Sequence, residues 1–286
     1  MSVNITTSFV EQYSANVQML SQQMGSQLRG AVDVESIKGK NSFFEQIGKV
    51  TAQLRTSRHG STPQIDTPHS RRSLTTATYE WADLIDDADK IRMLIDPTSS
   101  YAKAAAAAMG RAMDSVIITA ALGTAKTGVS GATSTALPSG QKVAHGSAGL
   151  TVAKLLSAKK ILDENDIDPS VKRFCVVSPE QVEDLLNTTE VKSSDFNTVK
   201  ALAQGDINSF LGFDFITSNL LTQDATPNRQ VFAFAADGIK LGIGKDITAK
   251  ISERDDKSYS TQVYYCMDLG ATRMEEEKIV EIACVE

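Results

Sequence analysis

The feature that most constrains this fold is a long alanine-rich segment, DPTSSYAKAAAAAMGRAMDSVIITAALG. Asp96 is a favourable N-cap, Pro97 suits the first helical position, and Gly123 suits the left-handed residue just past a helix end. The pattern therefore predicts one helix over residues 97–122. At 1.5 Å per residue such a helix is about 40 Å long, roughly the width of a small domain. It must form a backbone element of the fold, and the alanine run lets a sheet or another helix approach closely.

A second unusual segment is an extended, polar excursion between residues 31 and 81. An apolar group at 43–47 precedes the stretch RTSRHGSTPQIDTPHSRR, and apolar residues that alternate from 77 to 81 then predict a strand. A stretch of this composition cannot build a core alone, so we predict a long two-stranded excursion away from the body. An isolated hairpin is marginally stable in water, and this one should therefore lie on another surface.

The basic cluster that stands out in the sequence falls in this excursion, although the chain as a whole carries a formal charge of −6. We expect its arginines to pair with carboxylates of an adjacent subunit, because no aromatic residues interleave with them. A phosphate-binding patch is the alternative. Together with two neighbouring histidines, the candidates for inter-subunit contact here are Arg55, Arg58, His59, His69, Arg71 and Arg72.

The N-terminal segment predicts an amphipathic helix. Ser8 and Glu11 have capping-box spacing, and the opposite face is polar but almost uncharged. An apolar stripe follows at helical spacing and is formed by Phe9, Tyr13, Val17, Leu20 and Met24. The uncharged polar face suits contact with another chain, which makes Phe9, Tyr13 and Val17 further contact candidates. An ordinary amphipathic helix on its own domain explains the pattern equally well.

The remainder of the chain alternates between helices and strands. The patterns predict a helix over residues 151–164, a strand over 173–177, and a helix that opens at Ser178-Pro179. A further helix should end at Gly205, and a loop or weak hairpin should occupy the Gly- and Ser-rich residues 123–149. From Phe213 onward the patterns predict strands in FDFITS, RQVFAFAA, GIKLGI, ITAKIS, TQVYYCMDLG and KIVEIACV.

Composition excludes several classes of protein. A pI near 5.2 and an aromatic content of 6% argue against a protein that grips nucleic acid broadly. The apolar runs fall short of the ~20 residues that a membrane span needs, and the N-terminus lacks the pattern of a secretory signal, so a cytosolic origin is expected. Three widely separated cysteines in apolar runs are expected to be reduced core residues: Cys175, Cys266 and Cys284.

The sequence lacks the motifs of common catalytic and metal sites. In the stretch from Gly123 to Gly128 the last glycine is followed by Val129 and not by the Lys-Ser or Lys-Thr of a phosphate loop, and no GxSxG elbow occurs. The acidic residues 163–168 lack the glycine and closing carboxylate of a calcium loop and suggest a solvated helix end. We therefore predict no catalytic residue, metal ligand or cofactor. The acidic group Asp83, Asp86, Asp87 and Asp89 is expected to form a charged helix face.

The succession of these elements resembles the Hong Kong ninety-seven type fold of tailed-bacteriophage major capsid proteins. The phrases that carry the resemblance are RHGSTPQIDTPHSRRSLTTATYEWADLID, the alanine-rich helix, RFCVVSPEQVEDLL, and LAQGDINSFLGFDFITSNLL running into FAADGIKLGI. Each phrase alone has low specificity, but their order is specific and spans essentially the whole chain.

The resemblance implies an α+β fold with the parts typical of that family. These are an N-terminal arm, an extended loop, a peripheral domain built on a spine helix, an axial domain, and strands that return to the peripheral domain. In this sequence the matching ranges are 1–40, 41–82, 83–149, 150–236 and 237–286.

The same resemblance implies a structural role and no enzymatic activity. The expected function is a subunit that assembles into pentamers and hexamers of an icosahedral phage head enclosing double-stranded DNA. Expected partners are further copies of the chain, a separate scaffolding protein, and portal and head-decoration proteins, with no membrane. The expected location is the virion capsid, after assembly in the cytoplasm of an infected bacterium. The alternatives are an encapsulin-type compartment shell, which would enclose protein cargo, and a cytosolic α/β enzyme.

Overall fold

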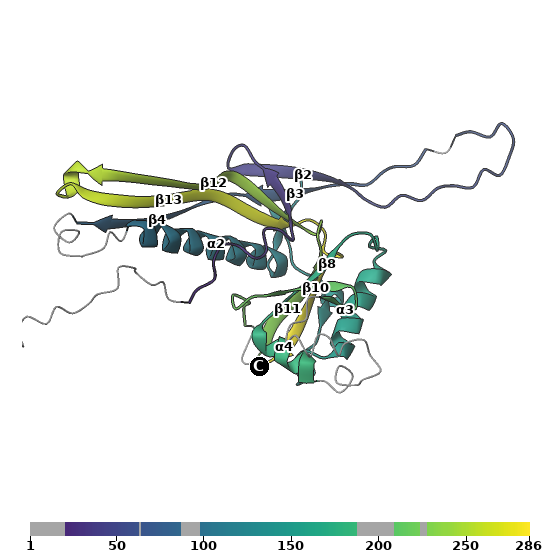
Figure 1. Ribbon diagram of the computed structural model, residues 1–286. Helices are drawn as coiled ribbons and strands as arrows, with labels where there is room; N and C mark the ends of the chain where they lie inside the picture. The colour runs from purple at the N-terminus through teal and green to yellow at the C-terminus, as the bar shows by residue number, and fades with distance from the viewer. Residues whose placement is uncertain (1–20, 63, 87–97, 188–208, 224–227) are drawn as a thin grey trace, which may run out of the picture.

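The computed structural model describes residues 21–62, 64–86, 98–187, 209–223 and 228–286. Figure 1 shows three parts: a long sheet with a long helix beneath it, a six-stranded sheet with helices beside it, and a hairpin that projects from the region where the two sheets meet. The predicted N-terminal helix lies largely outside the described residues, as does the helix predicted to end at Gly205.

The long helix is α2 (Thr98–Leu122), which confirms the predicted single helix and its C-terminal end. It packs under a four-stranded sheet of order β1-β12-β13-β4, and this face of α2 buries small and aliphatic side chains. They include Ala105, Met109, Met113, Ile117, Ile118 and Ala121. By length and composition α2 could also cross a membrane, but half of its most apolar stretch is buried inside the protein.

The strands of the long sheet are β1 (Asp33–Ser36), β4 (Ala77–Ile85), β12 (Ile239–Arg254) and β13 (Ser260–Arg273). The two strands predicted in GIKLGI and ITAKIS are one strand, β12, because irregular register between Ile243 and Thr248 lets pairing with β13 continue.

The acidic residues expected on one helix face are also placed differently. Asp83 lies within β4, opposite Val263 of β13, so the expectation of a helix is wrong there. Asp86 follows the strand without helical structure, while Asp87 and Asp89 lie outside the described residues. A sequence pattern does not show that this segment has a strand partner almost 180 residues away.

The second sheet has the order β7-β14-β11-β8-β10-β9. Its strands are β7 (Lys142–Val143), β8 (Arg173–Val177), β9 (Ser209–Phe210), β10 (Phe213–Thr217), β11 (Asn228–Ala235) and β14 (Ile279–Val285). β8 has the predicted bounds. The helices α3 (Val152–Glu164) and α4 (Pro179–Asn187) also lie where they were predicted. Thr151 caps α3, and Ser178 with Gln181 forms the capping contact of α4.

The last strand differs from the expectation for residues 237–286. β14 pairs antiparallel with β11, from Asn228 opposite Val285 to Phe234 opposite Ile279. It therefore belongs to the six-stranded sheet and not, with β12 and β13, to the long sheet. Apolar side chains on both of its faces explain this place, because a central strand is buried from both sides.

A third sheet, of order β2-β3-β5-β6, forms the base of the projecting hairpin. β2 (Asn41–Ile47) pairs with β3 (His69–Thr75), so the excursion is two-stranded, as predicted. The strand predicted over residues 77–81 is not its returning strand, because these residues belong to β4 and pair with β13. β5 (Ala125–Thr127) and β6 (Thr133–Thr135) form a small hairpin within residues 123–149, as one of the two readings of that segment predicted.

Three buried charges join the hairpin base to the rest of the molecule. Arg273 is fully buried and donates to the carbonyl oxygens of Ala121 (2.9 Å), Gly123 (2.7 Å) and Thr135 (2.9 Å). One side chain thus provides hydrogen-bond donors for carbonyl groups at the end of α2 and at the end of β6. Glu276 lies 3.6 Å from Arg273 Nε.

On the other side of Glu276 lies Arg72 of β3, which is also buried. Its Nη2 donates to Glu276, and its Nε donates to the carbonyl oxygen of Met274 at 2.7 Å. Glu276 therefore stands between two buried guanidinium groups. Removing one member of such a network leaves an uncompensated buried charge.

We expect Glu276→Gln to lower the free energy of unfolding by about 3 kcal/mol, because both arginines then lack their counter-charge. Denaturant titration of the purified chain measures the effect. Glu277→Gln is a matched control, because Glu277 is the exposed neighbour and should change stability little. Equal effects of the two substitutions would contradict the proposed importance of the buried charge.

A second charged cluster fastens the last residue, Glu286, to the six-stranded sheet. Glu286 accepts hydrogen bonds from Arg229 Nε (2.8 Å), the Ser178 hydroxyl (2.7 Å) and Gln181 Nε2 (3.1 Å). These donors favour the ionised carboxylate, with Arg229 as the largest cause, and lower the pKa of Glu286 from 4.5 to about 2.

A pKa that is lower in the folded state means that Glu286 stabilises the fold fully above pH 4.5 and loses this effect as pH falls towards 2. We expect Glu286→Gln to reduce the free energy of unfolding by about 1 to 2 kcal/mol at pH 7. The difference from the unsubstituted chain should shrink between pH 4.5 and pH 2. Denaturant titration across this pH range tests it, and a difference independent of pH would contradict it.

Candidate assembly surfaces

The projecting hairpin exposes almost all of its side chains beyond the paired strands. Between β2 and β3, the described residues of 48–68 are exposed except Thr67, which is half-buried. Large apolar side chains are among them, and Leu54 is 88% exposed. The others on or beside this segment are Ile47, Val50 and Ile65. Exposed apolar area costs free energy in water, so a cluster of this kind marks a surface that another molecule covers.

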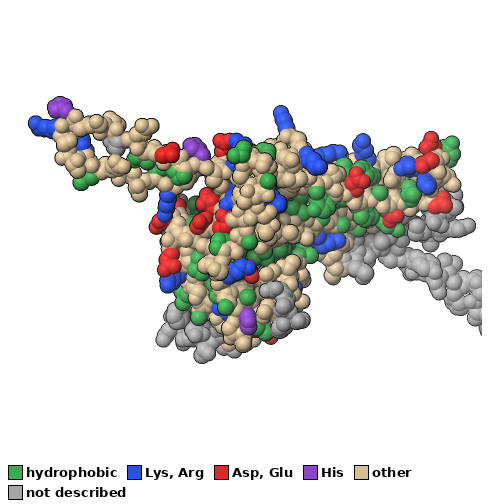
Figure 2. All heavy atoms as spheres, turned by 180° about the vertical axis from the view of Figure 1, so that it is seen from behind, with side chains coloured by type: hydrophobic (Ala, Val, Ile, Leu, Met, Phe, Trp, Pro, Cys, Tyr) green, Lys and Arg blue, Asp and Glu red, His purple; other side chains and the backbone are tan. Residues whose placement is uncertain are grey.

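Arg55, Arg58 and His59 lie on this exposed segment. Figure 2 shows basic and histidine side chains at the free end of the hairpin. Arg55 Nε donates to the Ser57 carbonyl oxygen at 2.9 Å. Within the described ranges, neither Arg55 nor Arg58 has a carboxylate at ion-pair distance. Two guanidinium groups at the end of a projecting loop are thus open to an outside partner.

His69 and Arg71 lie on β3, nearer the base of the hairpin. His69 is exposed, whereas Arg71 is half-buried and pairs with Glu45 across the two strands. The Arg71 guanidinium also lies 5.5 Å from the centroid of the Phe43 ring. Arg71 therefore has partners within its own chain, but its side chain remains partly exposed to solvent.

Arg72 differs from the expectation. The sequence grouped it with surface arginines, but alternation along β3 turns it towards the interior, where it pairs with Glu276. It is therefore not available for the expected contact with a neighbouring subunit. The burial of Arg72 could not be predicted from nearby residues, because its partner Glu276 lies 204 residues later in the chain.

Of the N-terminal candidates, Phe9, Tyr13 and Val17 lie outside the described residues. Met24, the last member of the same stripe, is 63% exposed and not helical. The prediction of a helix is therefore wrong at its C-terminal end.

The end of this arm is fixed to α2 by Asp114, which is fully buried. Its carboxylate accepts the backbone N–H groups of Gln27 (3.0 Å) and Leu28 (3.1 Å) and the Ser26 hydroxyl (2.5 Å). One turn earlier on α2, a Cβ added to Gly110 would lie 2.3 Å from the backbone of the arm. An acidic residue and a glycine within an apolar helix were the sequence signals for this crossing.

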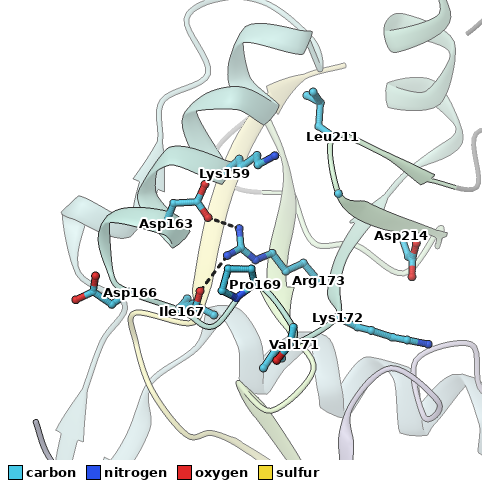
Figure 3. A pocket seen from close by; sticks show the side chains of 12 residues that line it. Lys159, Asp163, Asp166, Ile167, Pro169, Val171, Lys172, Arg173, Leu211 and Asp214 are labelled. Atoms are coloured by element: carbon cyan, nitrogen blue, oxygen red, sulfur yellow. Dashed lines mark hydrogen bonds and ion pairs between the residues drawn. The ribbon is translucent and has the colours of Figure 1, made fainter. Parts of the chain in front are cut away.

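A hollow of roughly 710 Å³ lies beside the six-stranded sheet (Figure 3). The end of α3, the start of β8 and the turn before β10 form its walls. Arg173 points into this region but is already engaged, because it donates to Asp163 (2.6 Å) and to the Ile167 carbonyl oxygen (3.2 Å). These contacts give the acidic stretch at the end of α3 a structural role.

Among the described residues, no group of three or more His, Cys, Asp or Glu side chains gathers in a way that could hold a metal ion. The three cysteines are free and buried, as predicted. Burial raises the pKa of the Cys175 thiol, and it raises that of Cys284 to about 11. Both are therefore protonated, inert core residues at neutral pH.

Comparison with solved structures identifies the fold. The chain matches the capsid protein of cyanophage P-SCSP1u with a TM-score of 0.78 and 18% identity, over 100% of this chain and 96% of that one. It matches a solved structure of Mycobacterium phage Che8 with a TM-score of 0.73 and 18% identity, over 96% of this chain and 97% of that one. It matches the capsid of a native GTA particle with a TM-score of 0.73 and 11% identity, over 99% of this chain and 98% of that one. This confirms the expected phage capsid fold of the Hong Kong ninety-seven type.

No curated protein matches the chain. A family model described as phage capsid protein matches residues 5–286, nearly the whole sequence. The encapsulin and enzyme alternatives receive no support from these matches. The projecting hairpin and the arm are consistent with this family match. The chain therefore belongs to the phage capsid protein family, in which it serves as a major structural subunit of the shell.

Proposed function

We propose that this subunit builds an icosahedral head from rings of five and six copies, and that the projecting hairpin makes the contact between neighbours. The observation that carries this proposal is the exposed segment between β2 and β3, which places apolar and arginine side chains in water without cover from its own chain. Head-to-tail contacts between identical subunits close into rings when the rotation between copies allows it.

We further propose that the parts of the chain correspond to the domains expected for this fold. The long sheet with α2 then forms the peripheral domain, and the six-stranded sheet with α3 and α4 forms the axial domain. The hairpin of β2 and β3 is the extended loop. In this assignment β14 moves to the axial domain, while residues 237–273 remain in the peripheral one.

The proposed partners follow from the same role. We propose that a separate scaffolding protein guides the curvature of the shell, and that a portal and decoration proteins are further partners. We propose that the shell encloses double-stranded DNA in the virion, after assembly in the cytoplasm of the infected bacterium. The formal charge of −6 fits a wall that encloses the genome without holding it tightly.

We expect a chain in which residues 50–66 are replaced by a short Gly-Ser linker to fold normally but to form no shells. The removed segment makes few contacts within its own chain, whereas β2, β3 and the buried Arg72 are retained. Circular dichroism tests the fold, and electron microscopy of protein expressed with its scaffold tests assembly. Normal shells from this variant would contradict the proposal.

The hairpin arginines also allow a direct test of the phosphate-binding alternative. We expect purified shells to bind duplex DNA no more tightly than non-specific proteins do, with a Kd of about 10⁻⁴ to 10⁻⁶ M at physiological salt. Arg55→Ala/Arg58→Ala should leave this value unchanged. Tighter binding that the double substitution removes would show that the arginines contact phosphate instead of a neighbouring subunit.

A further inference from the structure

One of the three cysteines lies on the face of the long sheet that α2 does not cover. Cys266 is in β13, where its neighbours Met267 and Leu269 belong to the core between the sheet and α2. Side chains alternate between the two faces of a strand, so Cys266 points to the same side as neither Met267 nor Leu269. Only 5% of Cys266 is exposed. The side chains that cover this thiol therefore come from the outer face of the sheet.

The side chain in contact with the thiol is Lys245 of β12. Its Nζ donates to Cys266 Sγ at 3.0 Å. Within the described ranges Lys245 has no carboxylate at ion-pair distance, so the thiol is the polar group that it engages. The register of β12 and β13 explains the contact. Lys245 pairs with Asp268, and the irregular step that follows brings Thr248 opposite Cys266.

Two further polar side chains lie beside this pair. The Tyr264 hydroxyl donates to Glu80 at 2.9 Å, and Glu80 lies opposite Cys266 in the pairing of β4 with β13. The hydrogen bond from Lys245 is the largest cause that lowers the pKa of the Cys266 thiol, whereas burial raises the pKa of the other two cysteines. A neighbouring ammonium favours the thiolate, which is the nucleophilic form of cysteine.

We propose that Cys266 and Lys245 form a redox-modification site, in which oxidation of the thiol by a peroxide joins the two side chains through a bond between Sγ and Nζ. In the first step the thiolate attacks a peroxide oxygen and the O–O bond breaks. The sulfur is oxidised to a sulfenic acid, and the peroxide is reduced to hydroxide, which takes up a proton to give water.

The second step uses the nitrogen that the fold places against the sulfur. A sulfenic acid condenses with a nitrogen within reach to give a sulfenamide. The Lys245 ammonium first loses a proton to solvent, and its Nζ lone pair then forms the bond to Sγ. The S–O bond breaks, and hydroxide leaves with a second proton from the amine as water. The thiol and amine together have then lost two hydrogen atoms, and no further oxidant is needed.

The link would fasten β12 to β13 where their pairing is irregular. The register shifts on both sides of Lys245, so the backbone ladder is interrupted there. Cytosolic thiols are kept reduced, so within the proposed function the link would form after a particle leaves the bacterium. Only this timing rests on the proposed function, because the bond itself forms within one chain.

Mass spectrometry of the full chain tests the proposal. The folded chain is treated with hydrogen peroxide, its remaining thiols are alkylated in denaturant, and it is digested. We expect the peptides that contain Lys245 and Cys266 to be joined with the loss of two hydrogen atoms, and dithiothreitol should separate them. Cys175 and Cys284 are buried in the core and should be recovered as alkylated thiols.

Two lysine substitutions on β12 form a matched pair. Lys245→Arg keeps the positive charge but removes the amine, so we expect no joined peptides and conversion of Cys266 to its sulfinic acid. Lys250→Arg changes an exposed lysine that lies opposite Tyr264, on the same face of the sheet. It should leave the yield of joined peptides unchanged. Both lysines are exposed, and circular dichroism checks that the fold is retained.

Three results would overturn the proposal: recovery of Cys266 as a free thiol, addition of oxygen to Cys266 while Lys245 stays a free amine, or an equal yield of joined peptides from Lys245→Arg. The melting temperature gives a second measurement. It should rise on oxidation, return with dithiothreitol, and not respond in Cys266→Ser. An equal response in Cys266→Ser would contradict the link. Neither measurement needs shells, so failure of the proposed function would leave both results unchanged.

Discussion

The architecture depends on one constraint: a hairpin that projects from the body exposes apolar side chains that its own chain does not cover. Leu54, at 88% exposure, is the extreme case. Burying apolar surface contributes about 25 cal/mol per Å², so covering a few such side chains favours association by several kcal/mol. Association also has an entropic cost, and a surface of this size yields a modest contact. Many modest contacts per subunit suit a shell, because a misplaced copy can leave before the shell closes.

A projecting element can direct assembly only if its base is held at a defined angle. Glu276, between the buried Arg72 and Arg273, supplies this restraint and also connects the hairpin with the C-terminal end of α2. Asp114 holds the arm in a defined position where it crosses α2 at Gly110. The long helix thus organises both the hairpin base and the arm. Buried ionic networks are costly, and their value here lies in fixing one geometry more than in net stability.

Local patterns were sufficient to predict many of the elements but not their neighbours. The end of α2, the bounds of β8 and the start of α4 follow from caps and periodicity, which depend on nearby residues. The place of β14 beside β11 and the strand at Asp83 depend on pairing with distant segments. The burial of Arg72 could not be predicted for the same reason, since its partner Glu276 is far away in the sequence. The exposed arginines and apolar residues of the excursion lie on the projecting hairpin that the sequence predicted.

Hydrogen exchange of the hairpin, compared between the free subunit and the assembled particle, tests the central claim most directly. Backbone amides of the described residues 49–67 lie outside the strands and should exchange rapidly in the free subunit. In the particle, contact with a neighbouring copy should slow them strongly, while amides of β8 in the core remain equally protected in both states. Slow exchange of residues 49–67 in a lone monomer, or rapid exchange that persists in the particle, would contradict the account.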